Sequence, residues 1–95
     1  MFKITHKRGF HITFPNEYTV SVQFGPGNYC ENYNMDISEI GSEEAGKKGS
    51  VNAECAVWGP NGEMIEHESF DGDTVGGRMS ATEVLGLLNW AESQK

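Results

Sequence analysis

The sequence predicts an α+β fold: an antiparallel sheet of four or five strands, arranged as a meander of hairpins and covered on one face by a single C-terminal helix. Three observations predict this fold class. Several segments alternate between apolar and polar residues, turn-forming sequences separate them, and the C-terminal segment repeats apolar residues at helical spacing. We expect one domain over residues 1–95, because a chain of this length has no room for a second hydrophobic core.

Four segments show the period of two that is typical of a half-buried β-strand. In the clearest of them, Phe10, Ile12 and Phe14 lie on one face of the strand. His11 and Thr13 lie on the other face, so the sheet should have one covered face and one solvent-exposed face. The four predicted strands are residues 2–6, 10–14, 18–24 and 51–57.

A hairpin is predicted after the fourth of these strands. The sequence Asn61-Gly62 is the strongest short signal for a β-hairpin. Residues 63–67 are therefore expected to return as a strand, with Met64 facing the core. The segment 69–79 follows and is expected to be a loop, because it is rich in glycine and aspartate.

The C-terminal helix is predicted over about residues 81–93. Ser80 and Glu83 have the spacing of a capping box, in which each side chain bonds the backbone N–H of the other residue. The helix carries an apolar stripe with the spacing i, i+3, i+4, i+7, which must be buried against the apolar face of the sheet. This stripe consists of Val84, Leu87, Leu88 and Ala91.

The chain is acidic, and its charge is unevenly distributed. Seven basic residues face fourteen acidic ones, which gives a net charge of −7. Residues 1–28 have three basic residues against one acid, or +2, and residues 29–95 have four against thirteen, or −9. An acidic body repels a phosphate backbone, so we expect no direct nucleic-acid binding. The same charge suits a partner with a basic surface, and it also keeps a small protein in solution.

We expect this protein in the cytoplasm. No segment has the roughly 20 apolar residues of a membrane span, and residues 1–14 lack the apolar run of a signal peptide. The two cysteines, Cys30 and Cys55, are then expected to remain reduced thiols.

Three stretches of the sequence resemble small proteins of bacteriophages and prophages. They are TVSVQFGPGNYCENY at 19–33, AECAVWGPNGEMI at 53–65 and GDTVGGRMSATEVLGLLNWA at 72–91. In that family an alternating strand leads into a turn of the form VSVQxGxxNYC. The resemblance covers about two thirds of the chain and skips the loop at 34–50. It implies phage origin and expression in a bacterial host, and it implies no catalytic activity.

The class of gene suggests a role for such a protein. Small acidic phage products are often antagonists of a host defence, such as a restriction or CRISPR complex or a nucleotide-signalling system. We therefore expect a non-enzymatic binding protein that blocks a host protein or complex by stoichiometric contact. This expectation comes from the resemblance and not from a motif in the residues.

The predicted contact surface combines Trp58 with part of an irregular loop at about 25–50. Tyrosine and tryptophan are enriched at protein interfaces, and acidic side chains speed association with a basic partner. The predicted contact residues are Tyr29, Glu31, Tyr33, Asp36, Glu39, Glu43, Glu44 and Trp58.

An alternative function is the sequestration of a nucleotide-type signal. Helix N-termini attract anions, and an arginine beside one can contact a phosphate in a bidentate manner. Two glycine-rich segments could supply backbone donors for this purpose. The candidate residues are Gly25, Gly27, Asn28, Gly76, Gly77, Arg78 and Ser80.

Other chemistry has weaker support in the sequence, and no metal, cofactor or enzymatic activity is expected. The side chains suited to zinc lack the usual ligand spacing, and the acids at 68–73 lack the spacing of an EF-hand. No nucleophile, base and orienting group can be assigned together. Pairing of an edge strand with a second copy remains open. The residues considered are His6, His11, Cys30, Cys55, His67, Glu68, Asp71 and Asp73.

Overall fold

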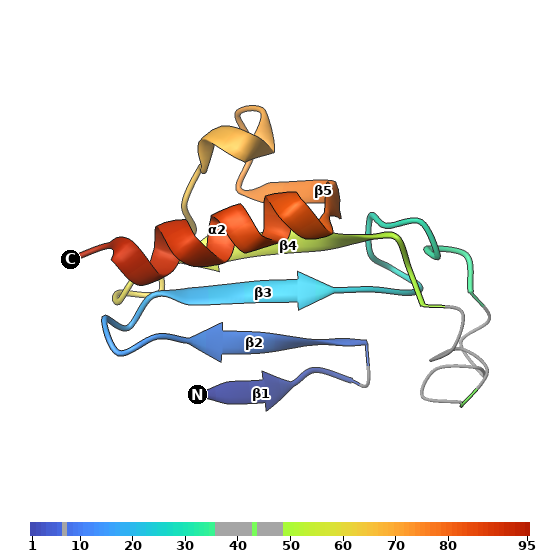
Figure 1. Cartoon of the computed structure of the whole chain (residues 1–95), viewed down its shortest axis with the longest axis horizontal. Helices are drawn as coiled ribbons and strands as arrows, with labels where there is room; N and C mark the ends of the chain where they lie inside the picture. Colours follow the sequence, from blue (N-terminus) through green and yellow to red (C-terminus); the bar gives the residue numbers. More distant parts are fainter. Residues whose placement is uncertain (7, 36–42, 44–48) are drawn as a thin grey trace.

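Five antiparallel strands form one sheet, in the order in which they occur along the chain (Figure 1). The computed structural model describes residues 1–6, 8–35, 43 and 49–95. The predicted α+β class, the meander and the single C-terminal helix are confirmed, and the strands number five. The elements are β1 (Phe2–Ile4), β2 (Gly9–Thr13), β3 (Thr19–Gln23), β4 (Asn52–Trp58), β5 (Val75–Ser80) and α2 (Ala81–Ser93).

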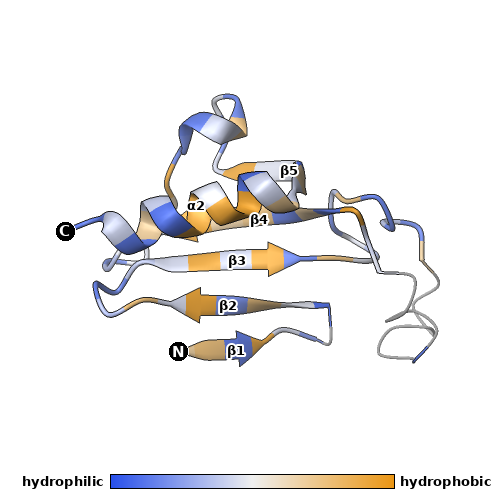
Figure 2. Ribbon diagram, viewed as in Figure 1, coloured by the Kyte–Doolittle hydropathy of each residue, from blue (hydrophilic) through white to orange (hydrophobic). Residues whose placement is uncertain are grey.

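The strand register places the apolar positions side by side on one face. Val20 pairs with Ile12 on one side and with Val57 on the other. Val22 pairs in the same way with Phe10 and Cys55. The helix α2 packs on this face over β3, β4 and β5, where Figure 2 shows apolar positions along the strands. The core therefore lies between one helix and the central part of one sheet.

The helix begins and ends as its sequence predicts. The Ser80 hydroxyl accepts a hydrogen bond from the Glu83 amide, and the Glu83 carboxylate accepts one from the Ser80 amide. Leu87 and Ala91 are buried, whereas Leu85 beside the stripe is 58% exposed. The helix thus turns its stripe toward the sheet and leaves one flank open.

The turn between β2 and β3 holds the C-terminal end of the helix. The Asn16 side-chain amide donates hydrogen bonds of 2.8 Å to the carbonyl oxygens of Ala91 and Gln94. These carbonyls lie at the end of α2, where the last turn lacks partners within the helix. Asn16 therefore fixes the end of the helix to the sheet.

The predicted strand at 63–67 is wrong. A single bridge joins Trp58 to Met64, and the chain then leaves the sheet for a short 3-10 turn, η2 (Glu68–Phe70). Met64 is 44% exposed and does not face the core. The fifth strand is instead β5, which occupies part of the segment predicted as a loop at 69–79.

The missing side chain of Gly76 explains why β5 has no visible alternation. Gly76 is buried and faces the core. A Cβ atom built there would lie 2.5 Å from Phe70 and 2.6 Å from the Met79 sulfur. The aromatic ring from η2 thus fills the core beside β5, in the place where an alternating strand would carry its own apolar residue.

The other face of the sheet carries polar side chains, as predicted, but its centre is not exposed to solvent, because Thr19 and Ser21 are each only 7% exposed. The Thr13 and Thr19 hydroxyls are 2.9 Å apart, and Gln23 donates to Ser21. Trp58 lies on this face, opposite to the side of β4 that carries Val57, and its ring meets the His11 ring edge-on at 5.0 Å.

Candidate protein-binding site

The loop after β3 is built around the Asn32 side chain. The chain leaves the strand through Gly25 and Gly27, whose φ angles of 76° and 85° favour glycine. The Asn32 side-chain oxygen accepts a hydrogen bond from the Gly25 amide at 3.0 Å and one from the Cys30 thiol at 3.1 Å. These bonds close residues 25–32 into a compact turn.

Two side chains from the start of β4 hold this turn against the sheet. The Glu54 carboxylate accepts a hydrogen bond of 2.9 Å from the Tyr29 amide. The Asn52 side-chain oxygen accepts another from the Glu31 amide. Both anchors satisfy backbone groups of a segment that has no regular structure of its own. The sequence alone did not identify these two residues, although alternation along β4 turns them away from the core.

Arg78 attaches the same turn to β5. Its backbone amide donates to the Tyr29 carbonyl at 2.8 Å, and its guanidinium donates to the Cys30 carbonyl at 3.1 Å. The guanidinium carbon lies 5.5 Å from the centre of the Tyr33 ring, within the range of a cation–π contact. Gly77 makes this approach possible, because a Cβ atom there would lie 2.9 Å from the Tyr29 Cβ.

The result is an exposed cluster of two tyrosines and an arginine on a fixed backbone. Tyr29 is 69% exposed and Tyr33 is 53% exposed, and Arg78 is also exposed. We call Tyr29, Tyr33 and Arg78 the Tyr–Arg surface. It joins residues that the sequence assigned to two different candidate sites.

Three of the remaining predicted contact residues, Glu31, Glu43 and Trp58, lie in the described part of the chain. Glu31 and Glu43 are exposed, whereas Asp36, Glu39 and Glu44 lie outside the described residues. Trp58 is six positions along β4 from Asn52, or about 20 Å at ~3.3 Å per residue. It therefore lies at the opposite end of the strand from the Tyr–Arg surface, and the structure does not bring it to the loop.

The residues proposed for a nucleotide already use many of their donors within the chain. The Gly25, Arg78 and Ser80 amides bond to Asn32, Tyr29 and Glu83.

The charge at the start of the helix also opposes an anion. The Glu83 carboxylate occupies the helix N-terminus with negative charge, and its bonds to Ser80 hold its pKa below the usual range. Gly76 faces the core and Asn28 bonds the Phe24 carbonyl, and Gly27 is exposed in the turn.

The cysteines and histidines lie apart. Cys30 and Cys55 are free and buried, and burial raises the pKa of the Cys55 thiol to about 12, with smaller contributions from Glu54 and Glu83. Such a thiol stays protonated and is a poor nucleophile. Within the described part of the chain, no three histidine, cysteine, aspartate or glutamate side chains gather as a metal site would require.

Comparisons with known proteins identify no relative of this chain. No protein-family model, curated protein or solved structure matches the chain. The resemblance to phage proteins therefore stays a prediction. Over residues 1–6, 8–35, 43 and 49–95, no helix is both long enough and apolar enough to cross a membrane.

Proposed function

We propose that this chain is a binding protein that blocks a bacterial host component by stoichiometric contact through the Tyr–Arg surface. The observation that carries the proposal is the exposure of Tyr29, Tyr33 and Arg78 side by side. Tyrosine and arginine are among the residue types that dominate the free energy of protein interfaces. The two tyrosines lie on the turn after β3, and Arg78 meets this turn from β5.

The anchoring of the loop favours tight binding. Glu54, Asn52 and Arg78 hold the backbone of residues 29–31 from two neighbouring strands. A surface that is ordered before association loses less conformational entropy when the partner binds. The Arg78 guanidinium also keeps the Tyr33 ring in place.

Charge suggests the chemistry of the partner. Residues 29–95 carry −9, and Glu31 lies exposed beside the Tyr–Arg surface. A partner with a basic rim around an apolar centre would be attracted over a distance of about one Debye length, roughly 8–10 Å at physiological salt. The resemblance to phage proteins supports a component of a bacterial anti-phage defence, met in the host cytoplasm, as the blocked partner.

Photo-crosslinking in a bacterial host tests the contact surface. A photoreactive phenylalanine analogue at Tyr29 or Tyr33 is expected to capture one defined host protein in a one-to-one product. The same analogue at Asn61, which is exposed in the β4 hairpin, serves as the control. Equal capture from Asn61, or none from the two tyrosines, would disprove this surface.

Affinity measurements with the captured protein test the energetics. Tyr33→Ala and Arg78→Ala are each expected to weaken binding by about tenfold or more, as truncation of a central interface residue does. Met64→Ala removes an exposed apolar side chain elsewhere and should leave the affinity unchanged. Titration calorimetry gives both the affinity and the stoichiometry, and a loss of binding in all three variants would contradict the assignment.

A further inference from the structure

The helix covers only part of the apolar face of the sheet. Phe2 pairs with Ile12, and Ile4 pairs with Phe10, so all four lie on the face that carries the core. The helix packs on β3, β4 and β5, and Figure 1 shows β1 and β2 to one side of it. Phe2 is consequently 70% exposed and Ile4 is 84% exposed.

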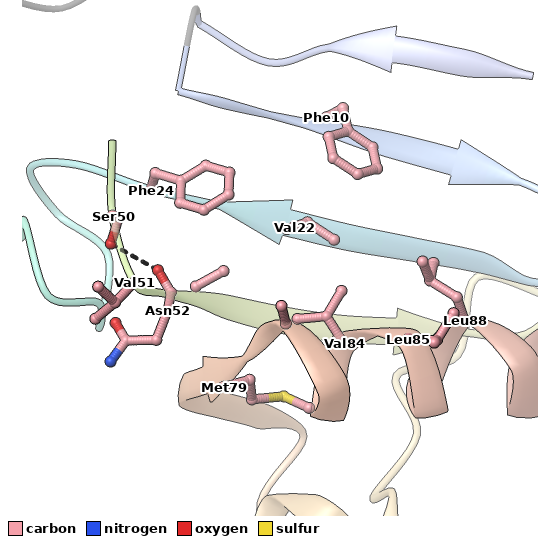
Figure 3. Close-up of a pocket in the computed structure, with 12 residues that line it drawn as sticks. Phe10, Val22, Phe24, Ser50, Val51, Asn52, Met79, Val84, Leu85 and Leu88 are labelled. Carbon is pink, nitrogen blue, oxygen red and sulfur yellow. Dashed lines mark hydrogen bonds between the residues drawn. The ribbon is translucent and has the colours of Figure 1, made fainter. Parts of the chain in front are cut away.

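A groove runs along the open flank of the helix (Figure 3). It has a volume of about 330 Å³. One wall consists of Phe10 and Val22 from the sheet and of Phe24, which follows β3. The helix contributes the other wall through Val84, Leu85 and Leu88.

The polar groups at the end of this groove are already engaged. The Ser50 hydroxyl donates to the Asn52 carbonyl at 2.7 Å, and the Asn52 side-chain oxygen accepts from Glu31. Small-molecule sites combine apolar walls with a few polar groups aimed at the ligand. A groove whose Ser50 hydroxyl and Asn52 side-chain oxygen already have partners within the chain suits apolar side chains.

We propose that a second copy of this chain covers the open half of the face, in a two-fold symmetric dimer. In this dimer β1 and β2 of each copy pack face to face on β1 and β2 of the other. Each groove then receives Phe2 and Ile4 of the second copy. The surface is distinct from the Tyr–Arg surface, and the proposal does not depend on the proposed function.

The shape of the chain is complementary to itself in this arrangement. Stacked sheets lie about 10 Å apart, and a helix with its side chains is about 10–12 Å across. The β1 and β2 strands of a second copy therefore fit in the layer that α2 occupies, beside the open flank of the helix. The two-fold axis in turn brings the helix of the second copy alongside the free edge of β1, which shields an otherwise open edge strand.

The exposed apolar area makes up a large part of what a dimer interface needs. Phe2, Ile4, Val51 and Leu85 are between 58% and 84% exposed. Together these four side chains expose on the order of 500 Å² of apolar surface. The half-buried side chains around the groove extend this toward the roughly 800 Å² that each partner buries in an interface of standard size.

Charge favours packing of the faces over pairing of the edges. An antiparallel pair of β1 edges centred on Lys3 would place two lysines directly opposite each other, which is unfavourable. Lys3 pairs with His11 on the polar face, so face-to-face packing leaves it in solvent. The sequences of β1 and β2 contain no acidic residue, so no acid of these strands faces another across the paired sheets.

Sedimentation equilibrium of the full chain tests the proposal with two neighbouring residues of β1. The wild type is expected to form a reversible dimer that strengthens with added salt, because salt screens the repulsion between acidic copies. Ile4→Glu would bury an unpaired charge and should weaken the dimer at least about tenfold. Lys3→Glu adds more negative charge on the opposite face and should keep the dimer.

A second variant separates the loss of the dimer from a loss of folding. Leu85→Glu changes an exposed position of the helix across the groove and should weaken the dimer as Ile4→Glu does, with an unchanged circular dichroism spectrum for both. A wild type that stays monomeric at millimolar concentration overturns the proposal. So does a dimer that resists both glutamate variants or that Lys3→Glu abolishes.

Discussion

At the scale of single residues, the buried Cys55 thiol makes the stability of the fold depend on pH. It lies on β4 at 1% exposure, between the helix and the sheet. Burial raises the pKa of its thiol from about 9.0 to about 12. The unfolded chain therefore loses this proton at a lower pH than the folded chain does. Its contribution to stability is complete below pH 9 and declines as the pH rises toward 12.

This linkage predicts a difference in slope between two proteins. In the wild type, the free energy of unfolding should fall more steeply between pH 9 and 11 than in Cys55→Ala, because the variant lacks the titrating thiol. Urea unfolding at a series of pH values measures both curves. Groups that titrate in both proteins cancel in the comparison. Parallel curves would show that the thiol ionises equally in the folded and unfolded chains.

At the scale of elements, alternation predicted the first four strands closely. Phe10, Ile12, Val20 and Val22 lie on the face that the sequence assigned to them. Local pattern was sufficient because each strand supplies its own apolar residues. The helix was predictable for the same reason, since Ser80 and the stripe that follows it are contiguous.

The β5 strand and the Tyr–Arg surface depend on contacts between distant segments. Gly76 has no side chain, so it adds no apolar residue to an alternating pattern in the sequence. Phe70, which belongs to η2, fills the space beside Gly76 in the core. Arg78 meets the Cys30 carbonyl 48 residues away. No local period encodes such a contact, so the sequence assigned the two halves of one surface to two separate sites.

Replacement of Gly76 tests this account of β5. Gly76→Ala would place a Cβ atom 2.5 Å from the Phe70 ring and should lower the free energy of unfolding by about 1–3 kcal/mol, as overpacking does. Gly86→Ala is the matched control, because that helical position is open to solvent. It should raise the free energy of unfolding by about 0.5–1 kcal/mol. Chemical denaturation measures both, and equal effects would mean that Phe70 moves aside without cost.

At the scale of the whole molecule, the sheet is wider than the helix that covers it. Five strands share one apolar face, and α2 packs on three of them. A small domain has few means of burying surface. Phe2 and Ile4 on β1 are therefore exposed in the single chain, and self-association would bury them.

The thermal stability should accordingly depend on protein concentration. Dimerisation stabilises the folded state by mass action, so a tenfold increase in concentration should raise the Tm of the wild type. Ile4→Glu should show a smaller rise of Tm with concentration over the same range. Differential scanning calorimetry at several concentrations measures this. An invariant Tm in the wild type would contradict a dimer that is formed only by folded chains.

Both tryptophans of this chain lie against a histidine. The Trp58 ring meets His11 at 5.0 Å, and the Trp90 ring meets His67 at 4.8 Å. A protonated imidazole quenches the fluorescence of a neighbouring indole, whereas a neutral one does so only weakly. Burial and the charge of Lys3 lower the pKa of His11, so Trp58 keeps its emission into more acidic solution than a fully solvated pair would. The fold thus contains an optical indicator of pH at Trp58, on the polar face of the sheet.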